Sequence, residues 1–148
     1  MKLLNRNYCW LVSLLLLLAG CGMFPSKIMS PDSQFAQVQD DFMQRLRWRD
    51  FQGAAQYFSE THRESFLQHF RESDDLNITD VRLLTTEYAA DDERMETEVE
   101  VEYFLLPSVT VKTFRFEQQW GFFRSGEKLP GKWRITSHFP EFPGFESP

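Results

Sequence analysis

Residues 94–105 read RMETEVEVEYFL, a stretch in which glutamates alternate with apolar or small side chains. One parity of the alternation contains Met95, Thr97, Val99, Val101, Tyr103 and Leu105. The other parity contains Glu96, Glu98, Glu100, Glu102 and Phe104. A period of two predicts a β-strand with one face in a core and the other face toward solvent.

Three more strands are expected around this one, at residues 78–88, 109–123 and 132–139. Short turns separate the first three, and a loop at 125–131 precedes the last. Strands that follow one another through short connections predict an antiparallel meander. In the third strand, Val109 and Val111 have the opposite parity to the aromatic residues that follow, so we predict a bulge near Lys112-Thr113. The alternative is an exposed aromatic patch that marks a partner surface.

Three helices are expected before the sheet. Residues 31–47 place Phe35, Val38, Phe42 and Leu46 on one helical face. A short helix follows Asp50, which is a candidate N-cap, and a third helix begins near Ser59. The predicted fold class is therefore α+β, with about three N-terminal helices packed on a curved four-stranded antiparallel sheet.

The N-terminus has the pattern of an export signal. Residues 1–7 include Lys2 and Arg6 and no acid, and residues 8–18 are apolar apart from Ser13. This apolar run is shorter than the roughly 20 residues that a membrane-spanning helix needs. Besides a lipoprotein signal that ends at Cys21, the segment could be an ordinary signal peptide in which this cysteine occurs by chance, or an anchor that is not cleaved.

The segment Leu18-Ala19-Gly20-Cys21 ends this run and resembles the bacterial lipobox. The resemblance implies cleavage between Gly20 and Cys21, acylation of Cys21, and attachment to a membrane through those acyl chains. Gly22, where the family's retention signal would be Asp, implies the outer membrane. The expected organisation is a signal peptide at 1–20, a lipidated tether at 21–31, one domain at 32–142 and a tail at 143–148.

Charge and cysteine content restrict the function classes. The 148-residue chain has a formal net charge of −6, and loss of the signal with its two cations would leave −8. Such an acidic chain disfavours nucleic acid as a partner. Cys9 lies in the signal and Cys21 would be acylated, so we expect no disulfide and no free thiol in the mature domain.

Several short segments suggest a family. They are Trp48-Arg49-Asp50-Phe51, Ala54-Ala55, Tyr57-Phe58, Phe66, Ile78-Thr79-Asp80, Gln119-Trp120, Gly131-Lys132-Trp133 and Phe139-Pro140. With the order of elements, they resemble small bacterial lipoproteins of unknown function that have a cystatin-like, nuclear transport factor two-like domain. The resemblance implies a cone between the helices and the concave face of the sheet. Some relatives, such as ketosteroid isomerases and SnoaL-like cyclases, use an acid or a histidine there as a base, and others only bind.

Six residues are candidates for lining a pocket or forming a partner surface: Asp50, Tyr103, Phe114, Phe116, Trp120 and Trp133. Asp50 is the best single candidate for a base, although capping of the second helix explains it more simply. We predict no catalytic set, no metal site and no cofactor, because His62 and His69 are two helical turns apart and His138 falls on the outer face of its strand. For the glutamates at 96–102 we expect cross-strand pairing with Arg82, Lys112 or Arg134 rather than calcium or a cationic partner.

The expected function is therefore a lipid-anchored binding domain in the periplasm, for an envelope protein or a small apolar ligand in the cone. One alternative is an enzyme of the isomerase or dehydratase kind with Asp50 or a tyrosine as the base. Another is a homodimer packed sheet to sheet.

Overall fold

The computed structural model describes residues 31–71, 74–89, 93–124 and 131–144. Within these ranges, three helices precede four strands: α2 (Pro31–Arg47), α3 (Phe51–Ala55), α4 (Glu60–His69), β1 (Leu76–Tyr88), β2 (Arg94–Leu105), β3 (Lys112–Phe123) and β4 (Lys132–Ile135). The strands form one antiparallel sheet in the order β1-β2-β3-β4. This confirms the predicted α+β fold class. The predicted signal peptide, Gly20, Cys21 and the tether to residue 30 lie outside the described residues.

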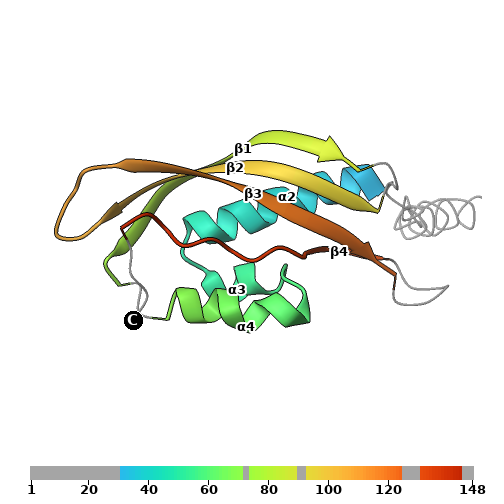
Figure 1. The fold of residues 1–148 in the computed structure, drawn as a ribbon, viewed down its shortest axis with the longest axis horizontal. Helices are drawn as coiled ribbons and strands as arrows, with labels where there is room; N and C mark the ends of the chain where they lie inside the picture. The colour runs from blue at the N-terminus through green and yellow to red at the C-terminus, as the bar shows by residue number, and fades with distance from the viewer. Residues whose placement is uncertain (1–30, 72–73, 90–92, 125–130, 145–148) are drawn as a thin grey trace, which may run out of the picture.

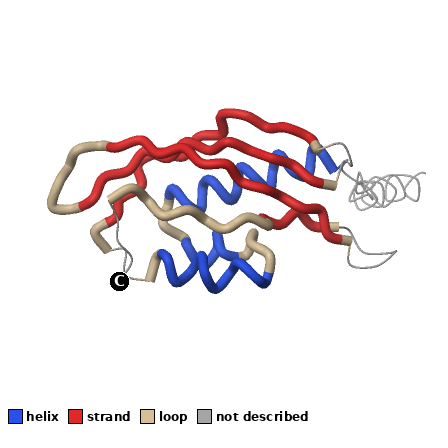
Figure 2. Tube along the Cα trace, in the orientation of Figure 1, coloured by secondary structure: helices blue, strands red, loops and turns tan. Residues whose placement is uncertain are grey.

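The helices lie together on one side of the curved sheet (Figures 1 and 2). Helix α2 runs along the concave face, while α3 and α4 lie beneath the edge of the sheet at β4 (Figure 1). None of the helices in the described ranges is long and apolar enough to cross a membrane.

The third strand corrects one expectation. Strand β3 begins at Lys112, so Val109 and Val111 precede it and are 77% and 54% exposed. Pairing between β2 and β3 runs without interruption from Arg94 opposite Gly121 to Tyr103 opposite Lys112, so the predicted bulge near Lys112-Thr113 is wrong. The register shifts occur in β1 instead, between Ile78 and Asp80 and between Leu83 and Thr85.

The fourth strand is shorter than predicted. It ends at Ile135, and the chain continues as an irregular segment to residue 144. Thr136 still donates its amide to the carbonyl of Gln119 at 2.8 Å, but Phe139 then packs against the ring of Phe66 on α4. Burial of this aromatic side chain takes the place of further strand pairing.

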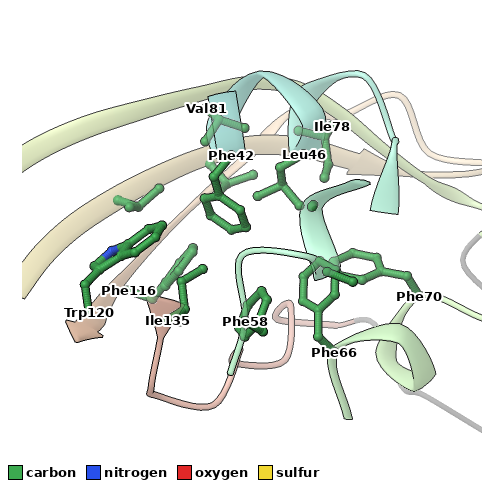
Figure 3. Packing of buried hydrophobic residues seen from close by; sticks show 14 of the residues in the cluster. Phe42, Leu46, Phe58, Phe66, Phe70, Ile78, Val81, Phe116, Trp120 and Ile135 are labelled. Carbon is green, nitrogen blue, oxygen red and sulfur yellow. The ribbon is translucent and has the colours of Figure 1, made fainter. Parts of the chain in front are cut away.

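Aromatic side chains dominate the core. Helix α2 contributes Phe42 and Leu46, which converge with side chains from α4 and the sheet (Figure 3). Phe58 stacks on Phe66 at a centroid distance of 4.5 Å, and Phe116 meets Phe139 edge to face at 5.2 Å. Each fully buried side chain of this size contributes about 1.5–3 kcal/mol relative to exposure. The interior of the predicted cone is therefore filled by the protein itself.

The C-terminal segment closes one end of this core. Phe142 is 1% exposed and contacts the ring of Tyr103 at 4.9 Å. The hydroxyl of Tyr103 donates a hydrogen bond to the carbonyl of Pro143 at 2.8 Å. The folded unit thus includes residues at the start of the segment that the sequence suggested was a tail.

We expect Phe142→Ala to lower the free energy of unfolding by about 3–5 kcal/mol, because truncation leaves a cavity between the C-terminal segment and the sheet. Phe123→Ala, at a position that is 50% exposed, is the control and should cost less than about 1 kcal/mol. Urea unfolding of both variants measures the difference. Equal losses would show that the segment does not complete the core.

Candidate functional site

Four of the six sequence candidates are core residues. Tyr103, Phe116, Trp120 and Trp133 are all buried, so these four side chains do not form an exposed aromatic surface. The reason is that their parity in the strands points them toward α2 and α4 rather than outward. Phe114 is half-buried and packs against Phe116 and Phe142. Trp133 also borders a surface cleft of about 260 Å³, and Trp120 borders another of about 250 Å³.

Asp50 has a structural role. Its Oδ1 accepts a hydrogen bond from the amide of Gly53 at 2.9 Å and so caps α3. Its Oδ2 accepts from Nη1 of Arg45 at 2.7 Å. Because both oxygens are engaged at the surface, the capping interpretation is confirmed and Asp50 does not point into the cone.

The ion pair at Asp50 belongs to a larger network that includes Asp41, Arg45 and Tyr57. Nε of Arg45 donates to Asp41 at 2.8 Å, and the hydroxyl of Tyr57 donates to the same carboxylate. A Cβ atom at Gly53 would collide with the side chains of Asp50 and Arg45, so the network needs glycine there. The sequence signal for it is the spacing of four between Asp41 and Arg45, but the approach of Tyr57 is a tertiary contact.

Hydrogen bonds and burial determine the protonation states of this network. Hydrogen bonds from Tyr57 and Arg45 hold the pKa of Asp41 below its usual value. Burial, followed by the hydrogen bond to Asp41, raises the pKa of Tyr57. A general base works best with a pKa near the operating pH, and both shifts move away from neutrality. Tyr57 therefore stays a proton donor, and Asp41 stays an anion.

A cleft lies beside Tyr57, between α2, the α3–α4 connection and β4. It has a volume of about 260 Å³. Its lining residues are Gln34, Val38, Gln56, Tyr57, Lys132, Trp133 and Arg134. Backbone hydrogen bonds fix two of its walls to each other, since Ile135 donates its amide to the carbonyl of Tyr57 at 2.8 Å and Ser59 donates to Ile135 at 2.9 Å.

Another hollow, of about 560 Å³, lies between α3 and α4. Its charged side chains include Asp50, which is paired with Arg45, and Arg71, which is 3.4 Å from Glu64. This hollow is larger than the cleft at Tyr57, but these charges are already paired within the protein.

The outer face of the sheet carries a network of ion pairs. Arg82 contacts Asp80 at 2.6 Å and Glu102 at 2.9 Å, while Arg115 contacts Glu100 at 2.7 Å. The predicted pairing of the glutamates is thus confirmed for Arg82. Lys112 and Arg134 form no ion pair with a described residue. No cluster of three or more potential metal ligands occurs in the described part of the chain.

The three histidines lie along the contact between α4 and the C-terminal segment. The rings of His62 and His138 meet at a centroid distance of 4.2 Å, which the sequence did not suggest. His138 is exposed, but β4 ends at Ile135 and the ring of His138 meets α4, so its predicted place on the outer face of a strand is wrong. Burial lowers the pKa of His69, whose ring packs against Phe139. The lowered pKa keeps the imidazole of His69 uncharged at neutral pH, which avoids placing a charge against the apolar ring of Phe139.

Comparison with solved structures finds a distant structural likeness. No model of a known protein family matches the chain. No curated protein matches it either. A solved structure described as "a putative polyketide cyclase" from Xanthomonas campestris pv. campestris matches 75% of this chain and 93% of its own length. The sequence identity is 15% and the TM-score is 0.43, and at this level the likeness says nothing about activity.

Replacement of Asp41 tests the network at Tyr57. Because the pKa of Asp41 is lower in the folded chain, its carboxylate stabilises the fold at neutral pH, and this contribution disappears as the pH falls through the folded-state pKa. Since the side chain is 44% exposed, we expect Asp41→Asn to cost only about 1 kcal/mol at pH 7. The difference from wild type should shrink below about pH 4.

The measurement is urea unfolding at pH 7 and pH 3. Asp40→Asn is the matched control, because Asp40 is exposed and accepts a hydrogen bond from its helical neighbour Gln44. It should change stability by less than about 0.5 kcal/mol. A pH-independent loss in Asp41→Asn would contradict the assigned protonation states.

Proposed function

We propose that the protein is a lipid-anchored domain of the bacterial cell envelope that binds a ligand or partner rather than catalysing a reaction. The observation that carries this proposal is the pairing of a Leu18-Ala19-Gly20-Cys21 motif with a domain whose interior is filled by its own aromatic side chains. Acyl chains on Cys21 would hold the domain at the outer membrane, facing the periplasm.

The filled interior supports binding over catalysis. Among the described residues, Glu100 is buried on the outer face of the sheet and is paired with Arg115 at 2.7 Å. The other buried polar side chains there are Gln39, Thr97 and Gln118, which are amides and a hydroxyl. These groups do not titrate near neutral pH, so they do not serve as a general base.

Of the tyrosines that the enzyme alternative could use, Tyr103 is buried and donates its hydroxyl to the carbonyl of Pro143. Tyr57 donates its hydroxyl to Asp41, and Tyr88 is exposed. The ligand is therefore expected at the surface and not in the cone.

The homodimer alternative has weaker support. Sheet-to-sheet packing would bring together two copies of an outer face that carries Arg82, Glu100, Glu102 and Arg115. These charges are already paired within one copy, and burying them would carry a desolvation cost. An apolar outer face would have favoured such a dimer.

Cys21→Ser tests the anchor. It should abolish incorporation of a labelled fatty acid and leave the larger uncut precursor, because the thiol is the acceptor of the lipid. Metabolic labelling and gel mobility measure both effects. Cys9→Ser is the matched control and should be labelled and processed normally, since Cys9 lies within the segment that is removed. Normal labelling of Cys21→Ser would exclude the anchor.

A further inference from the structure

Arg134 stands apart from most arginines of this protein. Within the described residues, Arg45, Arg47, Arg71, Arg82, Arg115 and Arg124 each have a carboxylate oxygen at 2.6–3.4 Å. Arg134 has no acidic partner among these residues, and its Nη1 donates to the carbonyl of Trp133 at 3.0 Å. A partly buried guanidinium without a counter-ion is unusual in a chain with 22 acidic and 16 basic residues.

Further positive charge surrounds Arg134. Lys132 lines the same cleft and also has no carboxylate partner in the described part of the chain. Arg63 lies close enough that its charge, together with burial, lowers the pKa of Arg134. The guanidinium of Arg63 donates to the carbonyls of Ala55 and Phe58 rather than to an acid. Like charges are thus held near one another, and none of them forms an ion pair with a carboxylate of the described residues.

The rest of the cleft fits a small organic anion. None of its lining residues is acidic. The amide of Gln56 offers donors, and Gln34 keeps one N–H after donating to the carbonyl of Gly131 at 3.2 Å. Val38 and Trp133 supply an apolar wall. The hydroxyl of Tyr57 is already committed to Asp41, whose own charge is offset by Arg45.

We infer that this cleft binds the carboxylate or phosphate end of a small organic anion, with Arg134 and Lys132 as the charged contacts and Trp133 against the apolar part. The guanidinium presents a planar fork of donors that matches either oxyanion. This inference rests on the proposed binding function, and it does not depend on the lipid anchor.

The test is a calorimetric titration of the full-length protein in detergent with benzoate, phenyl phosphate and the neutral analogue benzyl alcohol. We expect at least one of the two anions to bind and benzyl alcohol not to bind. Preference between benzoate and phenyl phosphate distinguishes a carboxylate ligand from a phosphate ligand. Absence of binding by both anions up to about 10 mM, or equal binding of benzyl alcohol, would overturn the inference.

Variants locate the site. Arg134→Gln should raise the Kd of the bound anion about tenfold or more, because a charged hydrogen bond is lost. Arg124→Gln is the matched control, since Arg124 is exposed and paired with Glu93 at 3.0 Å, and its Kd should stay within about twofold. An unchanged Kd in Arg134→Gln, or an equal rise in both variants, would contradict the site.

Lys132→Gln keeps the inference testable if Arg134→Gln does not fold. Lys132 is exposed, so its replacement leaves the core intact, and we expect the Kd to rise about threefold. An unchanged Kd in this variant would then overturn the assignment. Because labelling of Cys21 is measured separately, failure of anion binding is distinguishable from failure of the anchor.

Discussion

The contact between α2 and Trp120 of β3 is the interaction on which the rest of the structure depends. Trp120 meets Phe35 edge to face at 5.4 Å and Phe42 at 5.9 Å, so two turns of the helix are held against the middle of the sheet. Such pairs contribute about 0.5–1.5 kcal/mol beyond the burial of their area. Because these contacts fix the rotation of α2 about its axis, they also determine which way the residues on its other faces point. Asp41 and Arg45 lie toward Tyr57, while Gln34 and Val38 form a wall of the cleft.

The second constraint is the attachment of β4 to the connection between α3 and α4. Phe58 and Ile135 form an isolated parallel bridge, so the edge of the sheet is capped by a segment from the helical half of the chain. Covering an edge strand in this way removes unpaired backbone groups. It also places Tyr57 beside residues of β4, although they are more than 70 positions apart in the sequence. The cleft exists because of this attachment, and its charge comes from β4.

The fold could be predicted where a single periodicity extends over many residues. The bounds of β2 and α2 agree with the sequence because their alternation and helical spacing are unbroken. The third and fourth strands were predicted to be too long, because apolar residues beyond their ends continue the alternation that is typical of a strand. Val109, before β3, is exposed, and Phe139, after β4, packs against α4. The site was mostly missed. Asp50 was recognised as a cap because a cap is local. The lack of an ion pair between Arg134 and any described carboxylate depends instead on where the acidic side chains lie after folding.

Because Phe142 closes one end of the core, the first and last described residues lie at opposite ends of the domain. Residue 31 enters at the end where β3 finishes, since Phe35 packs on Trp120 and Gln34 bonds to Gly131. The chain leaves at the other end, where Pro143 accepts from Tyr103 (Figure 1). The two ends are separated by the length of β3, which at about 3.3 Å per residue is roughly 40 Å. A reporter joined after Gly144, the last residue that the structure describes, would therefore start from the end of the domain opposite the start of α2. It would have to leave Phe142 seated, because shortening the chain by only seven residues removes that side chain.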